Sequence, residues 1–130
     1  MSDVTDPRAW LERATQDDKL ARLSLRQKPP LTYGACFHAQ QCAEKCLKAL
    51  LVASNHAFSK IHDLLKLRDE CAQAGIQAPI AEDKLSLLSS YAVRVRYPGE
   101  DPTLEEAREA VETATAVLRF TQKFLQGAPS

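Results

Sequence analysis

The sequence predicts an all-α protein: an up-and-down antiparallel bundle of four to five helices, in a single domain (1–130) with its core at about 7–125. Two observations predict this fold class. Glycine is scarce, at four residues in 130, and no stretch keeps the alternation that marks a strand. Apolar residues recur instead at spacings of three and four, the period of an amphipathic helix. With 45% apolar residues, a chain of this length is expected to bury one hydrophobic core.

The first predicted helix starts at Asp6-Pro7, which supplies an N-cap and a first-turn proline, and runs toward Lys28. Pro29-Pro30 ends it, because proline cannot continue the hydrogen-bond ladder. Asp17 and Asp18 lie on the inner stripe of this helix. The apolar members of the stripe are Trp10 or Leu11, Ala14, Ala21 and Leu25. A carboxylate on this stripe is expected to lie at its solvent-exposed edge or to pair with a cation.

The second predicted helix is capped by Thr32 and ends near Ser54-Asn55. Small and apolar residues recur at helical spacing along one face of this helix, and this face is predicted to lie in the core. They are Cys36, Ala39, Ala43, Cys46, Leu47, Leu50 and Leu51. The polar flank of the same helix carries His38, Gln41, Lys45 and Lys48, with Glu44 beside them.

Three further helices complete the bundle. The third is predicted to start at Ser59 and to end at Gly75, a left-handed terminator. A linker, 77–81, leads to a fourth helix that stops at Pro98-Gly99. In the stretch 103–106, Thr103 and Glu106 form a capping box, in which each side chain bonds the other residue's backbone amide and so opens a long last helix.

The charge balance argues against bulk electrostatic capture of nucleic acid or of an anionic membrane. Lys plus Arg number 17, as do Asp plus Glu, so the formal net charge is zero. The charges still cluster, and both clusters are interpreted as exposed helix faces. The basic run is Lys19, Arg22, Arg26 and Lys28; the acidic run is Glu100, Asp101, Glu105, Glu106, Glu109 and Glu112.

The four cysteines, Cys36, Cys42, Cys46 and Cys71, form no C-x-x-C pair and have no histidine at zinc spacing. They are predicted to be reduced, buried and apolar in behaviour, so neither a metal site nor a cofactor is expected. No apolar run reaches the length of a membrane span, and the N-terminus lacks an apolar signal core. The sequence therefore predicts a cytoplasmic protein without membrane contact.

Three motifs in order resemble the HEPN domain family, the higher-eukaryote and prokaryote nucleotide-binding domain. They are FHAQQCAEKCLKAL at 37–50, HDL at 62–64, and Tyr91 followed by RYP at 96–98. The resemblance covers about residues 7–125. It implies a bundle of four or five helices that is often a homodimer and is frequently encoded beside a minimal nucleotidyltransferase, its partner in a two-component, toxin–antitoxin-like module.

Some relatives in this family are toxins that cut RNA without a metal. The resemblance implies that they need an arginine followed by a histidine about four to six residues later. Neither Arg94 nor Arg96 has a later histidine in this sequence, because the last one is His62. No catalytic residue is therefore predicted.

The stretch YAVRVRYPGE supplies four candidate ligand-binding residues: Tyr91, Arg94, Arg96 and Tyr97. In the functional interpretation, Arg96 binds a nucleotide or RNA phosphate or a partner's carboxylate, and a tyrosine stacks or hydrogen-bonds nearby. In the structural interpretation, an arginine complements the helix end and a tyrosine buries its ring. The sequence leaves both interpretations open.

Three more candidates lie outside this stretch: Lys45, His62 and Asp17. In an antiparallel bundle, His62 is expected near the end of the second helix, beside Lys48 or Leu51 rather than beside His38, so a catalytic dyad is not supported. Local hydrogen bonding near the start of the third helix is the simpler role for His62. Asp17 is expected to meet a cation, with Lys45 or Arg96 as candidates, in a salt bridge or in a site.

The leading hypothesis is a non-catalytic HEPN-type module that binds a nucleotidyltransferase partner, with a nucleotide or RNA as candidate ligand. One alternative is a metal-independent ribonuclease toxin that uses Arg96 with His38 or His62, which requires both groups within reach of one phosphate. A second alternative is a structural dimerisation bundle in which every motif residue serves folding.

Overall fold

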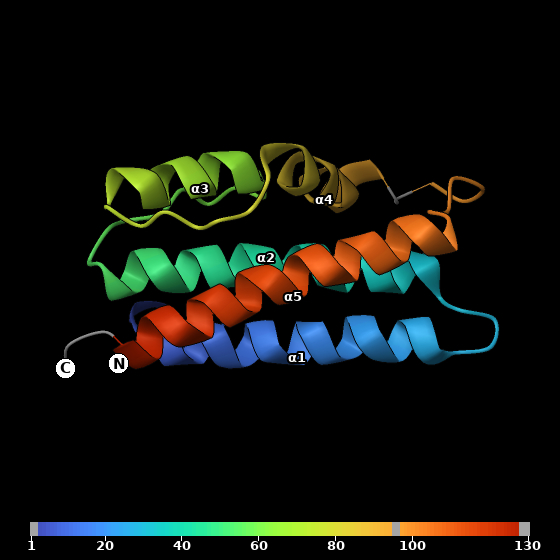
Figure 1. Cartoon of the computed structure of the whole chain (residues 1–130), viewed down its shortest axis with the longest axis horizontal. Helices are drawn as coiled ribbons and strands as arrows, with labels where there is room; N and C mark the ends of the chain where they lie inside the picture. Colours follow the sequence, from blue (N-terminus) through green and yellow to red (C-terminus); the bar gives the residue numbers. More distant parts are fainter. Residues whose placement is uncertain (1–2, 95–96, 128–130) are drawn as a thin grey trace.

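The computed structural model describes residues 3–94 and 97–127, and within these residues every regular element is helical. A short 3₁₀ turn, η1 (Asp3–Thr5), precedes five α-helices (Figure 1). These are α1 (Pro7–Arg26), α2 (Thr32–Ala53), α3 (Leu64–Gln73), α4 (Glu82–Arg94) and α5 (Leu104–Gly127). The predicted all-α bundle of four to five helices is confirmed.

Four helices alternate in direction along the bundle: α1, α2, α4 and α5 (Figure 1). The remaining helix, α3, instead runs in the same direction as α2, because the segment 54–63 first returns along α2. Gln40 of α2 accordingly meets the backbone of His62 just before α3, while Leu47 meets Cys71 near the end of α3. This return segment brings His62 to the middle of α2 instead of to its end.

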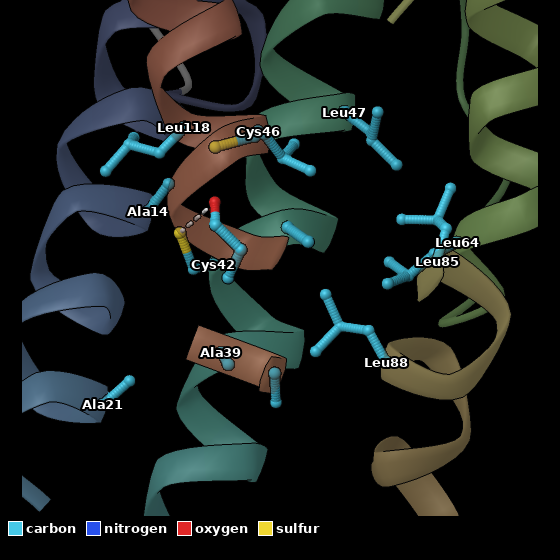
Figure 2. Close-up of a cluster of buried hydrophobic side chains, with 14 of the residues drawn as sticks. Ala14, Ala21, Ala39, Cys42, Cys46, Leu47, Leu64, Leu85, Leu88 and Leu118 are labelled. Carbon is cyan, nitrogen blue, oxygen red and sulfur yellow. Dashed lines mark hydrogen bonds between the residues drawn. The ribbon is translucent and has the colours of Figure 1, made fainter. Parts of the chain in front are cut away.

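Small side chains fill the core where α1, α2 and α5 meet (Figure 2). Ala14 and Ala21 of α1 and Ala39 of α2 are at most 1% exposed. At Gly34, a Cβ atom would lie 3.1 Å from Ser24 Oγ, so α1 and α2 approach closely near their connection. Close packing of this kind lets polar side chains at the edge of one helix reach the next helix.

Leucines fill the other side of α2, toward α3 and α4 (Figure 2). Leu47, Leu64, Leu85 and Leu88 are all at most 1% exposed. All seven residues predicted for the inner face of α2 are buried: Cys36, Ala39, Ala43, Cys46, Leu47, Leu50 and Leu51. The helical period in the sequence therefore identified the core face of α2 correctly.

Three predicted signals for the start or the end of a helix are confirmed. The Asp6 side chain caps α1 by accepting a hydrogen bond from Arg8 N at 2.9 Å. Gly75 follows α3 with φ +86°, the left-handed conformation expected there. At α5 the capping box is complete, with Thr103 N donating to Glu106 Oε1 (2.9 Å) and Glu106 N donating to Thr103 Oγ1 (3.1 Å).

Two predicted helix starts are wrong. Thr32 is the first residue of α2, the N-cap is Leu31, and no side chain caps this end. The third helix starts at Leu64 instead of Ser59, because the Asp63 carboxylate accepts from Leu65 N and Lys66 N and so caps the helix there. The Ser59 hydroxyl instead donates to Glu70 Oε2 at 2.8 Å, which holds the return segment against α3.

The four cysteines are free thiols with no exposed surface, as predicted. Burial, together with the nearby Glu70 carboxylate, raises the pKa of the Cys71 thiol from 9.0 to about 12. The pKa of the Cys42 thiol is also raised, first by a hydrogen bond with Cys46 and then by burial. Both thiols therefore stay protonated at neutral pH.

The capping box gives a direct test of how α5 begins. We expect Thr103→Ala to lower the free energy of unfolding by about 1 kcal/mol, because the Glu106 amide loses its acceptor. Urea denaturation measures the change. Ser86→Ala, at an exposed position of α4, is the control and should change little. Equal losses in the two variants would contradict the assignment.

The raised pKa of Cys71 predicts a loss of stability in alkali. The unfolded thiol ionises from its ordinary value of 9.0, whereas the folded thiol keeps its proton until about 12. Stability from this group is complete below the first value and falls as pH rises toward the second. In urea titrations at rising pH, Cys71→Ala should therefore lose less stability than the wild type. Parallel pH profiles would show that Cys71 is not the cause.

Candidate functional site

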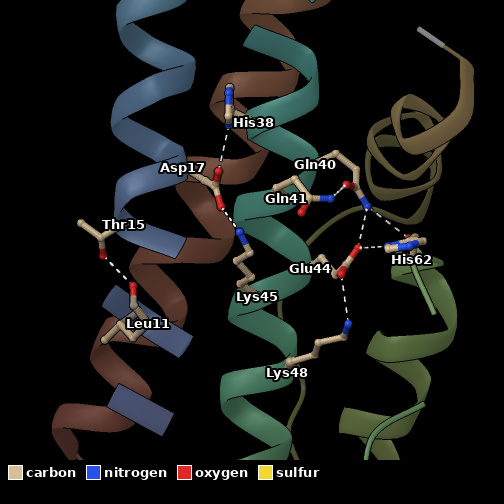
Figure 3. Close-up of polar contacts among 10 residues, drawn as sticks. All are labelled: Leu11, Thr15, Asp17, His38, Gln40, Gln41, Glu44, Lys45, Lys48 and His62. Atoms are coloured by element: carbon tan, nitrogen blue, oxygen red, sulfur yellow. Dashed lines mark hydrogen bonds and ion pairs between the residues drawn. The ribbon is translucent and has the colours of Figure 1, made fainter. Parts of the chain in front are cut away.

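Three predicted site residues, Asp17, Lys45 and His62, belong to two separate polar clusters along the flank of α2 (Figure 3). The first, here the Asp17 cluster, contains Asp17 of α1 with His38 and Lys45 of α2. The second, here the Glu44 cluster, contains Gln40, Glu44 and Lys48 of α2 with His62 from the return segment. These clusters are organised around two buried carboxylates.

In the Asp17 cluster one carboxylate binds two side chains of the neighbouring helix. Asp17 is 6% exposed, with Oδ1 2.9 Å from His38 Nδ1 and Oδ2 2.5 Å from Lys45 Nζ. His38 and Lys45 are two turns apart on α2, so the carboxylate spans this distance from α1. The predicted cation for Asp17 is therefore Lys45, and His38 is a second partner that the sequence alone did not reveal.

An open hollow of about 440 Å³ lies beside the Asp17 cluster and is lined by α1 and by Lys45 of α2. Arg13 faces it and has no hydrogen bond or ion pair with the residues that the structure describes. The full lining is Ala9, Glu12, Arg13, Gln16, Asp17, Leu20 and Lys45. Two cations, Arg13 and Lys45, and two carboxylates, Glu12 and Asp17, thus border a space that can hold a small polar or charged group.

The Glu44 cluster is more deeply buried. Glu44 is 4% exposed and Lys48 is 7% exposed, with Lys48 Nζ 3.0 Å from Glu44 Oε2. The Lys48 ammonium also lies 5.8 Å from the ring centre of Trp10 and 5.3 Å from that of Phe58, within range of cation–π attraction. Glu44 and Lys48, four residues apart on α2, form this buried ion pair, so removing either partner leaves an uncompensated buried charge, which costs several kcal/mol.

His62 is fixed at the surface by the Glu44 cluster. Its Nδ1 lies 2.8 Å from Glu44 Oε1, while 70% of its side chain is exposed. Its backbone carbonyl accepts from Gln40 Nε2 at 3.2 Å. Because the carboxylate can only accept, Nδ1 donates and the second ring nitrogen, Nε2, is left to the solvent side. The structure places His62 beside Gln40 and Glu44 in the middle of α2 rather than near Lys48 or Leu51 as predicted, and its partner is Glu44 and not a local group.

A third polar group joins α1 to α5. Asp18 accepts from Arg22 Nε at 3.0 Å and from Thr115 Oγ1 at 2.9 Å. Arg22 Nη2 donates to Thr115 Oγ1 at 3.1 Å, which closes the triangle. The sequence showed Asp18 on the inner stripe, but its partner Thr115 is 97 residues away and could not be inferred.

The remaining candidates lie at the end of α4. Tyr91 is 1% exposed and belongs to the core, consistent with the structural interpretation of its ring. Tyr97 is 62% exposed and follows the helix. Arg94 is the last residue of α4, but its side chain and the whole of Arg96 lie outside the described residues. The phosphate-binding role of the two arginines stays a prediction.

Two classes of site are not found in the part of the chain that the structure describes. No group of three or more His, Cys, Asp or Glu side chains is arranged to hold a metal ion. Among the same residues, no helix combines the length and the apolar character that crossing a bilayer requires.

Comparison with known proteins connects this geometry to a family. The model of the HEPN domain matches residues 7–124. Among solved structures, the crystal structure of TT1696 from Thermus thermophilus superposes with a TM-score of 0.72 at 30% sequence identity. The alignment covers 95% of this chain and 98% of that one. The comparison with curated proteins gave no match.

The Glu44 cluster predicts that one substitution causes a large loss of stability and that a second substitution restores most of it. Glu44→Leu should lower the free energy of unfolding by about 3 kcal/mol or more, because Lys48 is left charged and buried. The double variant Glu44→Leu/Lys48→Met should recover most of the loss, because both charges are then gone. Chemical denaturation measures both, with exposed Glu109→Leu as the control. An additive loss in the double variant would contradict the pairing.

Proposed function

This chain belongs to the HEPN domain family, and from that premise we propose that it is a non-catalytic binding module. It binds a minimal nucleotidyltransferase as its protein partner, in a two-component, toxin–antitoxin-like system. A nucleotide or RNA is its second ligand. The function is to hold these molecules and not to break a bond.

One observation carries the preference for binding over cleavage. His38 and His62 each direct Nδ1 at a buried carboxylate, and they belong to two different clusters. A metal-independent nuclease needs a histidine and an arginine at one phosphate. In the described residues, each of these histidines is instead held by a carboxylate of a neighbouring element, which favours a positioning role.

The hollow beside the Asp17 cluster supports a site for an anionic ligand. Lys45 keeps 23% of its side chain exposed while it is bonded to Asp17, and Arg13 faces the same space without a partner in the described chain. An ammonium and a guanidinium on one rim suit a phosphate group. The predicted corner at 94–98, with exposed Tyr97, is proposed as a second contact for the same ligand or for the protein partner.

Exposed apolar side chains support a protein partner and a homodimer. Large exposed apolar residues occur in the second half of α1, in its connection to α2 and in the first two turns of α2, and exposed apolar surface often marks an interface. They are Leu20, Leu23, Leu31, Tyr33 and Phe37, each at least 36% exposed. We place the protein in the cytoplasm, where four free thiols persist as thiols.

The ligand is tested by titrating the protein with ATP and with a short RNA, following binding and RNA cleavage together. We expect Lys45→Ala, Arg13→Ala and Arg96→Ala each to weaken binding about tenfold, as loss of a charge-assisted contact should. Lys84→Ala, which removes an exposed cation from α4, should bind like the wild type, and the RNA should stay intact. Melting curves separate lost binding from lost folding. Cleavage that disappears in His62→Ala would favour the ribonuclease instead.

The protein partner is tested by co-expression with a minimal nucleotidyltransferase encoded beside this chain. Size-exclusion chromatography with light scattering should give one complex that contains both proteins. The same measurement on this chain alone should give a dimer. Separate elution of the two proteins would remove the partner from the proposal, and a monomer would remove the homodimer.

A further inference from the structure

We propose that the groove between α1 and α5 binds an acidic, partly apolar helical segment of a partner protein. The groove consists of two adjoining hollows of about 390 and 310 Å³, which share Arg22, Val111 and Glu112. It lies away from Lys45 and the hollow beside the Asp17 cluster. The proposal does not depend on the nucleotide or RNA site or on the identity of the partner.

The groove is rich in arginine. Four arginines line it against one glutamate, Glu112. The arginines are Arg22 and Arg26 from α1, and Arg108 and Arg119 from α5. In a chain whose formal net charge is zero, this is a strong local excess of positive charge.

Three of these arginines have no internal role that the described structure shows. Arg26, Arg108 and Arg119 are exposed and make no hydrogen bond or ion pair with the described residues. The fourth, Arg22, is held in place by Asp18 and Thr115. These bonds use two of the five N–H donors of the guanidinium, so the others remain for a ligand in a fixed orientation.

The floor of the groove is aliphatic. Leu25 packs against the core, Val111 is 7% exposed, and Ala116 lies beside them. Cations around an aliphatic floor match a helix that carries acids on its edges and aliphatic side chains on its inner face. Arg108 and Arg119 are eleven residues apart on α5, so the groove is about 16 Å long, or about three helical turns.

Two features favour a peptide over a nucleic-acid strand. The described residues that line the groove include no aromatic side chain, whereas single-stranded nucleic acid is usually bound by stacking. Glu112 also lies within the groove. A peptide can place a neutral or basic residue opposite this carboxylate, but a nucleic acid carries a negative charge at every nucleotide.

The test uses a labelled synthetic peptide of about 14 residues, about 20 Å long as a helix, with glutamates and leucines at helical spacing. Fluorescence anisotropy should show binding by the wild type. The triple variant Arg26→Ala/Arg108→Ala/Arg119→Ala should bind at least about tenfold more weakly, because it loses the arginine contacts. The matched control Arg8→Ala/Lys60→Ala/Lys84→Ala removes three exposed cations elsewhere and should bind like the wild type. A peptide with glutamine in place of glutamate should not bind.

Three results would overturn the proposal. The first is no binding of the peptide by the wild type, and the second is an equal loss in the triple variant and its matched control. The third is that a single-stranded RNA of equal charge binds more tightly than the peptide and that the triple variant loses affinity for this RNA to the same extent. That result would make the groove a nucleic-acid surface. If the triple variant melts at a lower temperature, the single variants Arg108→Ala and Arg119→Ala repeat the comparison in a stable background.

Discussion

The need to pair buried charges is the constraint on which the rest of this structure depends. Three carboxylates, those of Asp17, Asp18 and Glu44, are at most 9% exposed. A buried charge without a partner costs several kcal/mol, so each carboxylate restricts the bundle to arrangements that bring a partner to it. Asp17 joins α1 to α2, Asp18 joins α1 to α5, and Glu44 joins α2 to the segment before α3. Each of these three contacts is therefore specified by one acid.

This constraint also explains the arrangement of the polar surface. Small residues such as Ala14, Ala39 and Gly34 bring α1 and α2 close, so Asp17 reaches two turns of the facing helix. The same pairings hold His62, Lys45 and Arg22 in fixed positions with part of each side chain exposed. A residue held in this way loses little entropy on binding, which favours recognition of a ligand or partner.

Local sequence signals predicted the fold well and failed where two signals competed. Asp6 and the Thr103 capping box each placed a helix start correctly, because their hydrogen bonds join residues at most three positions apart. The sequence pattern favours Ser59 as a helix start, although Asp63 supplies the stronger cap, a carboxylate that accepts two amides. Ser59 instead bonds Glu70, a contact that forms only once α3 has folded and that local sequence signals do not reveal.

The sequence by itself determined the helical class, the core face of α2 and the burial of the cysteines, and it required a cation at Asp17 without deciding between Lys45 and Arg96. Each follows from local periodicity or from the cost of an unpaired charge. Only the tertiary structure decided that His38 shares Asp17, that His62 meets Glu44, and that Arg22 and Thr115 close around Asp18. The physical reason is distance along the chain. The pairs His38–Asp17, His62–Glu44 and Thr115–Asp18 lie 18 to 97 residues apart, and helical periodicity indicates which face of a helix is buried but not which residue of another helix will face it.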